Sequence, residues 1–166
     1  MSGIELKKVV KTMLWLENIE SIKDAGNVDC IDISVNSSDF GIRLANGMVV
    51  QNKSVDTDLN SDFIPRFNMC LDENTEICSG SRESVTTLKE LKVGDWVETY
   101  IQGFKQINGK AEATVDCVKI TTSEGKTLIC ASDHRVLVHN TKSGSYYWTK
   151  ACDIDIKNNQ IVVYKK

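Results

Sequence analysis

Several features that would assign a protein to a class at once are missing from this chain of 166 residues. No apolar run approaches the roughly 18 residues that a membrane-spanning helix needs. The net charge of −3 comes with no basic block, so nothing indicates nucleic-acid binding. No signal-peptide pattern opens the chain. We therefore expect a cytoplasmic monomer that binds neither nucleic acid nor a membrane.

Paired cysteine motifs are also missing, although cysteine itself is not scarce. The chain has no signal that would direct it to an oxidising compartment, which favours free thiols, most of them buried, over disulfides. The cysteines are Cys30, Cys70, Cys78, Cys117, Cys130 and Cys152. Cys130, His134 and His139 form a loose metal-like group, but no Cys-x-x-Cys pair accompanies them. We expect no metal and no cofactor, and we expect His139 at the surface.

Proline occurs once, at Pro65, within residues 53–69. This segment shows neither a period of 2 nor one of 3.6, so it is either a connector between two parts or an ordinary long loop. Structureless loops beyond about 12–15 residues are uncommon inside a compact domain. We therefore place a boundary at 53–69.

The remaining pattern is typical of an all-β fold with little helix. Asn46-Gly47 between apolar residues is a strong hairpin signal, and Met48–Val50 after it predicts a short buried strand. Residues 4–16 permit either a short amphipathic helix or a strand. Further strands are expected at 28–35, 75–78, 96–101, 113–122 and 126–130; turns at 24–27, 79–84, Asn108-Gly109 and 123–125; and a helical turn at 87–91.

Two positions carry groups that can cut the chain from within. Asn52 follows the predicted buried strand, and its side-chain amide can attack its own main-chain carbonyl, which forms a succinimide and breaks the bond to Lys53. Eighteen positions later, the thiol of Cys70 can attack the carbonyl of Met69. One segment therefore ends in a self-cleaving amide and the next begins with a nucleophile.

Together these two stretches resemble the ends of an intein, a protein-splicing domain of the Hint (hedgehog/intein) type, in reverse order. Residues 1–52 resemble the C-terminal part and 70–166 the N-terminal part, with 53–69 as an extein-like connector. A circularly permuted or rejoined split intein would have this arrangement. The resemblance implies one Hint domain, made by 1–52 and 70–166 together. Its fold would be a flattened all-β disc of curled strands with pseudo-twofold symmetry, and Leu88–Tyr100 faintly echoes Cys152–Tyr164.

The resemblance also suggests which residues assist. His134 matches the histidine of the family's Thr-x-x-His block, which protonates the departing amide nitrogen, while Ala131 stands where that block has threonine. Asp32 matches an aspartate that influences the nucleophiles and proton transfers. Without the resemblance, Asp32 is a surface residue on a strand and His134 a half-buried histidine at the start of one.

Two departures bear on activity. Gln51 replaces the family's penultimate histidine, and glutamine donates no titratable proton near neutral pH. Lys53 replaces the Ser, Thr or Cys that accepts the migrating acyl group. We therefore expect single-turnover self-processing, with the chain's own residues 53–69 as substrate, in which thioester formation at Cys70 persists, acyl transfer fails and Asn52 cleaves slowly.

Two other classes remain open at this point. Cys70 and His134 could form the dyad of a Cys-His hydrolase that acts on a separate substrate. Alternatively, the chain could be a catalytically silent β binding module, in which Cys70→Ala would change only stability.

Overall fold

The computed structural model describes residues 14–35, 41–51 and 70–164. These residues are mostly in strands, and their helical segments are two 3-10 turns, η3 (Leu88–Glu90) and η4 (Ala151–Asp153). The prediction of an all-β protein is confirmed. No helical segment among the described residues has the length and apolar character to span a membrane.

Among the described residues, ten strands form one sheet and two short strands form another. The large sheet has the order β2-β3-β10-β12-β1-β4-β9-β8-β7, with β11 paired to β10 and a further pairing between β1 and β8. The strands are β1 (Leu14–Val35), β2 (Gly41–Arg43), β3 (Val49–Gln51), β4 (Leu71–Asp72), β5 (Glu76–Cys78), β6 (Val85–Thr87), β7 (Trp96–Glu98), β8 (Phe104–Thr122), β9 (Thr127–Ala131), β10 (Arg135–Asn140), β11 (Tyr146–Lys150) and β12 (Asn159–Tyr164).

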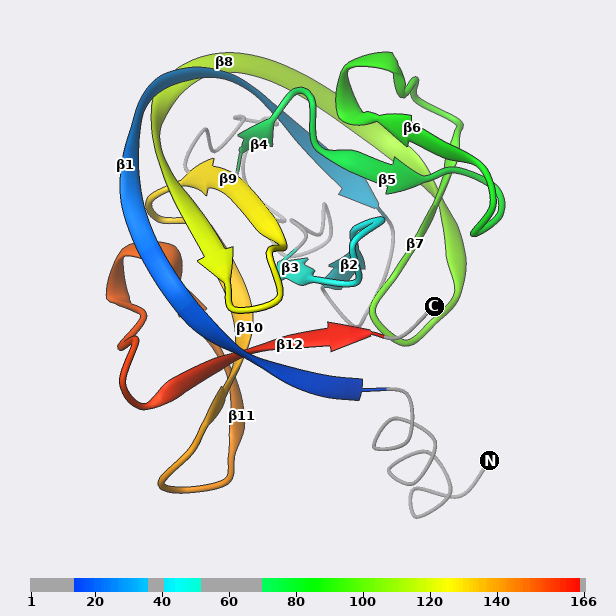
Figure 1. Cartoon of the computed structure of the whole chain (residues 1–166). Coiled ribbons are helices and arrows are strands. Elements are labelled where there is room, and N and C mark those ends of the chain that lie inside the picture. Colours follow the sequence, from blue (N-terminus) through cyan, green and yellow to red (C-terminus); the bar gives the residue numbers. More distant parts are fainter. Residues whose placement is uncertain (1–13, 36–40, 52–69, 165–166) are drawn as a thin grey trace, which may run out of the picture.

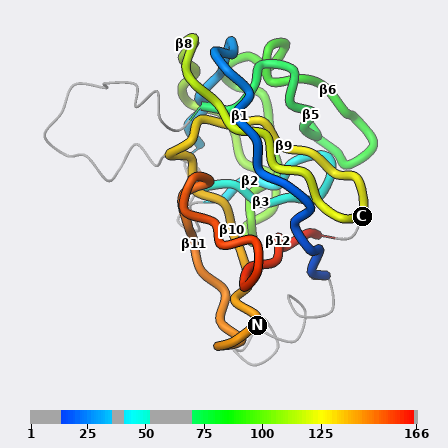
Figure 2. Tube along the Cα trace, turned by 60° about the vertical axis from the view of Figure 1, so that its left-hand side comes forward, coloured from blue at the N-terminus to red at the C-terminus, as the bar shows by residue number. Residues whose placement is uncertain are grey.

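Two long strands, β1 and β8, curl around the shorter ones and lie side by side in both views (Figure 1, Figure 2). Their antiparallel pairing runs from Ile19↔Thr122 to Val35↔Ile107. Because β1 also pairs with β4, and β4 with β9, the strands β1, β4, β9 and β8 close into a ring. Cys70 lies directly before β4, which is one strand of this ring.

Two predicted turns are wrong, because the pairing of β1 with β8 continues through both. Asp24–Asn27 is a bulge within β1: the register shifts between Asp24 and Gly26, and Gly26 has a φ of +72°. Asn108-Gly109 lies inside β8, where Asn108 Oδ1 accepts a hydrogen bond from the Ser34 hydroxyl at 2.8 Å. A long partner strand therefore overrides the local preference for a turn.

Other local predictions are confirmed. Asn46-Gly47 forms the turn between β2 and β3, with Gly47 at a φ of +89°. Residues 123–125 connect β8 to β9, and the helical turn expected at 87–91 is η3.

The strand expected to reach residue 101 is shorter, since β7 ends at Glu98. Of the segment 4–16, residues 4–13 lie outside the described residues and 14–16 belong to β1.

The same order of elements occurs twice. The β5–β6 hairpin is followed by η3 and by β7, which pairs with β8; the β10–β11 hairpin is followed by η4 and by β12, which pairs with β1. The faint sequence echo covers the second half of each unit. Each unit leads to a tyrosine, Tyr100 or Tyr164. The two rings are arranged edge to face, with their centroids 5.9 Å apart.

Candidate active site

Cys70 lies immediately before β4 and is fully buried. In β4, Leu71 pairs with Ile31 of β1 on one side and with Cys130 of β9 on the other. The carbonyl of Cys70 accepts a hydrogen bond of 2.9 Å from the backbone N–H of Ala131, which continues the β4–β9 pairing. A backbone hydrogen bond therefore fixes Cys70 directly to β9.

Asp32, in β1, lies on the side of Cys70 opposite to β9. The pairs Cys30↔Asp72 and Ile31↔Leu71 set the antiparallel register of β1 and β4, and the next pair in this register is Asp32 with Cys70. Asp32 is only 6% exposed, so it is not the surface residue that the strand pattern alone would allow. A buried carboxylate beside a buried thiol can take part in a proton transfer, whereas a solvated surface aspartate could not.

His134 lies in the turn between β9 and β10 and is 2% exposed. Its backbone N–H donates to the carbonyl of Ala131 at 2.9 Å, and its own carbonyl accepts from Ala151 N–H at the same distance. Ala131 is thus the direct link between the two predicted residues, since it bonds Cys70 through its N–H and His134 through its carbonyl. The structure brings Asp32, Cys70, Ala131 and His134 together from β1, β4 and the end of β9.

Gln51 is half-buried at the end of β3. Its neighbour Val50 pairs with Val136 of β10, two residues after His134, so β3 and the histidine turn are adjacent. Three predicted residues of the cleavage junctions, Asn52, Lys53 and Met69, lie outside the described residues.

Two further thiols that the sequence reading did not assign to the site lie beside Cys70. Cys30 of β1 and Cys117 of β8 are buried, form a cluster with Cys70, and have their sulfurs 3.3 Å apart. A signal for Cys117 existed, because the predicted hairpin across 123–125 puts it opposite Ala131, as observed. All six cysteines are free, as predicted, and all except Cys152 are buried.

The surroundings of Cys70 favour the protonated thiol. Burial, followed by the negative charge of Asp32 and by Cys117, raises the pKa of Cys70 from 9.0 to about 12. Burial also raises the pKa of Cys30 and of Cys130. The thiol of Cys70 is therefore neutral near neutral pH, and it would have to lose its proton in order to act as a nucleophile.

The second histidine is in a different place from His134. His139 is half-buried rather than at the surface, and its ring lies 4.8 Å from that of Tyr146 at the far end of β10. Within residues 14–35, 41–51 and 70–164, no three His, Cys, Asp or Glu side chains are grouped to hold a metal ion.

A groove of about 490 Å³ lies nearby, between the 44–46 turn, residues 72–76 and β9. Its walls include Asn46, Asp72, Glu76 and Ile129, but Cys70 and His134 are not among its lining residues. This groove therefore does not lead to the thiol of Cys70.

Comparison with models of known protein families found no match, and comparison with curated proteins found no relative. The assignment of a function consequently depends on the residues and their geometry.

Proposed function

We propose that this protein is a self-processing domain of the protein-splicing type with a Hint fold, built from residues 1–52 and 70–166. Its substrate is its own backbone at the two ends of residues 53–69. The observation that carries the proposal is the location of Cys70, which is buried between Asp32 on β1 and the Ala131–His134 turn after β9.

In the first step, Cys70 Sγ attacks the carbonyl carbon of Met69 and its proton is released to a base. The Met69–Cys70 amide bond breaks, a thioester forms, and the freed amine of Cys70 takes up a proton. An amide nitrogen leaves only when it is protonated, and a histidine titrates in the range to supply that proton. Asp32, beside the thiol, is suited to receive the sulfur's proton, and His134 to deliver one to nitrogen.

In the second reaction, the side-chain nitrogen of Asn52 attacks its own carbonyl carbon. The bond to Lys53 breaks, and the amine of Lys53 leaves with a proton. The products are a succinimide at the end of 1–52 and a free 53–166, whose masses add up to that of the intact chain because no water is consumed. Lys53 has neither hydroxyl nor thiol to accept the acyl group from Cys70, so the two cleavages are not coupled into splicing.

The repeated order of elements also supports the proposal. A Hint domain has a pseudo-twofold relation of this kind, and its long strands curl round one centre. Here β1 and β8 curl around the shorter strands (Figure 1), and β12 pairs with β1 as β7 pairs with β8.

The burial of Cys70 argues against a hydrolase that acts on a separate substrate. Such an enzyme needs an open path to its nucleophile, whereas Cys70 is 0% exposed and is absent from the lining of the 490 Å³ groove. An adjoining peptide bond of the same chain needs no path.

Hydroxylamine tests the proposal, because it attacks thioesters. We expect the full chain, incubated with hydroxylamine at neutral pH, to give fragments 1–69 and 70–166 by intact mass. Cys70→Ala should give neither fragment, whereas Cys152→Ala, which removes the exposed cysteine, should cleave like the wild type. Fragments that begin at Gly47 or Gly109 would report ordinary Asn-Gly cleavage instead.

The absence of a fragment that begins at Cys70 from the wild type would contradict the proposal. Undiminished cleavage there in Cys70→Ala would contradict it equally. A silent binding module predicts the first of these results.

A further inference from the structure

The hairpin of β2 and β3, residues 41–51, leads directly to Asn52 and is held at two equivalent points of the repeated units. After β7, the N–H of Tyr100 donates to the carbonyl of Gly41 at 2.8 Å. At the end of β12, the N–H of Tyr164 donates to the carbonyl of Gly47, also at 2.8 Å. The hairpin is thus seated between the ends of two strands that belong to different repeats.

The fit at both points is close. A Cβ added to Gly41 would lie 2.5 Å from the Cβ of Tyr100, and one added to Gly47 would overlap the carbonyl oxygen of Tyr164. Glycine at these two positions lets the hairpin approach both strands without a gap. Because these contacts are so close, a displacement of the hairpin at either glycine would also shift the end of β3.

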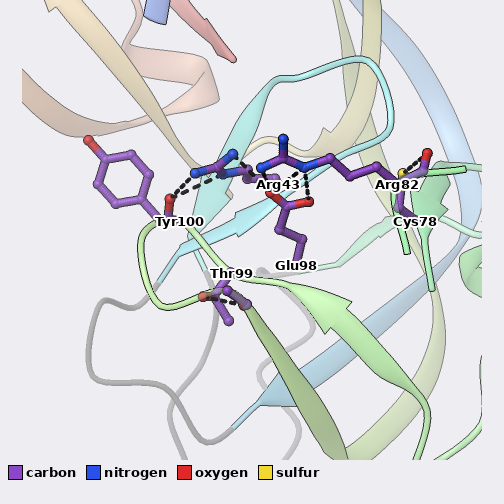
Figure 3. A network of polar contacts seen from close by, with 7 residues as sticks. Arg43, Cys78, Arg82, Glu98, Thr99 and Tyr100 are labelled. Atoms are coloured by element: carbon purple, nitrogen blue, oxygen red, sulfur yellow. Dashed lines mark hydrogen bonds and ion pairs between the residues drawn. The ribbon is translucent and has the colours of Figure 1, made fainter. Parts of the chain in front are cut away.

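Arg43 of β2 joins the hairpin to Glu98 and Tyr100 through its side chain (Figure 3), and the same side chain contacts Tyr164. Its Nε and Nη2 donate to the carbonyl of Tyr100 at 3.1 and 3.0 Å, and its Nη1 forms an ion pair of 2.9 Å with Glu98. Its guanidinium carbon also lies 3.5 Å from the centre of the Tyr164 ring. The Arg43 side chain is 13% exposed, so these contacts are shielded from water.

Glu98 has a second cationic partner that provides a matched comparison. Arg82 binds the same carboxylate, with Nη2–Oε1 at 2.8 Å and Nε–Oε2 at 3.1 Å (Figure 3). Its side chain is 43% exposed, and it lies in the segment between β5 and β6 rather than on the hairpin. Arg43 and Arg82 therefore share one carboxylate, but only Arg43 is part of the hairpin.

Asparagine cyclisation needs the attacking nitrogen and the carbonyl in one geometry, and a displacement of about 1 Å can lower such a rate about a hundredfold. We propose that Arg43 is a positioning residue that fixes the β2–β3 hairpin on Glu98, Tyr100 and Tyr164 and thereby controls cleavage after Asn52. This inference rests on the proposed function. The chemistry at Cys70 is independent of Arg43, because Cys70 is held by β1 and β9.

Arg43→Met and Arg82→Met test the proposal in the full chain. We expect Arg43→Met to lower the rate of cleavage between Asn52 and Lys53 by about tenfold or more, while hydroxylamine cleavage at Cys70 changes by less than about twofold. Arg82→Met should change both rates by less than about twofold, because partly exposed ion pairs contribute little. Arg43→Lys keeps a positive charge beside Glu98 but loses the two hydrogen bonds to the carbonyl of Tyr100. Its rate of cleavage between Asn52 and Lys53 should therefore lie between those of the wild type and Arg43→Met.

The two rates, read from the same intact masses, distinguish the possible failures. If Arg43→Met leaves their ratio unchanged, through no effect or an equal loss, the inference is wrong and the proposed function stands. If the wild type reacts at Cys70 but never cleaves after Asn52, the inference is again wrong by itself. If the wild type is inert at both junctions, the proposed function and the inference both fail. Should Arg43→Met not fold, the same ratio in Arg43→Lys decides.

Discussion

At the scale of single residues, the environment of Cys70 is the reverse of that in most reactive cysteines. Activated thiols usually lie near positive charge, which lowers their pKa. Here burial, Asp32 and Cys117 raise the pKa of Cys70 to about 12. A buried and protonated thiol is a poor nucleophile toward dissolved reagents, which is consistent with the proposed single reaction on its own chain.

The raised pKa of Cys70 predicts a loss of stability in alkali. The folded thiol keeps its proton up to about pH 12, whereas the unfolded thiol loses it near 9.0. The contribution of this group is therefore fully present below pH 9.0 and is lost as pH rises through 12. We expect urea unfolding to show a constant difference in the free energy of unfolding between wild type and Cys70→Ala up to pH 9.0. Above that pH the wild type should lose stability relative to Cys70→Ala.

A difference between these two proteins that stays constant from pH 7 to pH 11 would contradict this prediction. Asp32→Asn provides an internal check. It removes one of the causes of the raised pKa, so the decline should still begin near pH 9.0 but should end at a lower pH than in the wild type, with a smaller total loss.

Residue chemistry alone could single out Cys70 and Asn52, whereas the assisting residues of the candidate site could be predicted only with the help of the family resemblance. Cys70 was predicted from its chemistry together with Asn52, and Asp32 and His134 from the resemblance to an intein. Strand register and backbone hydrogen bonds bring these three residues together. Cys30 was missed even though it shares a strand face with Asp32, because a buried thiol has no chemical signature in the sequence. Its contact with Cys117 depends on how β1 and β8 curl, which no local pattern encodes.

At the scale of elements, one dipeptide has two outcomes. Asn46-Gly47 forms a turn because Asn46 accepts from Met48 N–H at 3.0 Å and donates to the carbonyl of Thr127 at the same distance. Asn108-Gly109 stays extended because β8 pairs with β1 on either side of it. A turn signal in the local sequence therefore predicts a turn only where no distant strand pairs with the segment. Where such a strand does pair with it, the pairing keeps the segment extended.

Glu17 shows how β1 is fastened to the turn after β8. It is 3% exposed and accepts from the Thr122 hydroxyl and from Lys126 Nζ, both at 2.7 Å. We expect Glu17→Ala to lower the free energy of unfolding by about 2–4 kcal/mol, because it leaves buried partners without an acceptor. Glu20→Ala, on the exposed face of the same strand, should cost less than about 0.5 kcal/mol. Urea denaturation at neutral pH measures both.

The acid range gives a second test of Glu17. Burial raises its pKa, but the hydrogen bonds from Lys126, Thr122 and Trp15 outweigh burial and hold it below 4.5. Its contribution is therefore present above pH 4.5 and is lost as pH falls through the folded value. A stability difference between wild type and Glu17→Ala that does not shrink in acid would show that the ion pair is not its source.

At the scale of the whole molecule, the two parts of the chain interleave in one sheet. β4 lies between β1 and β9, and β12 lies between β10 and β1, so strands from before residue 52 pair with strands from after residue 70 on both sides. The strand class and several turns could be predicted from the sequence, since these are local. The order of the strands in the sheet could not be predicted. The residues that β1 pairs with lie far away in the sequence, from Val35↔Ile107 to Leu14↔Tyr164, and such pairing leaves no periodic trace in either strand.

The proposed self-processing requires Cys70 and His134 to act at one centre, and the rate of hydroxylamine cleavage at Cys70 in His134→Ala tests this most directly. Loss of the proton donor should lower that rate by about a hundredfold or more. His139→Ala is the matched control, since it removes the other histidine, at the far end of β10, and should cleave at the wild-type rate. Cleavage in a folded His134→Ala protein at the wild-type rate would contradict the account.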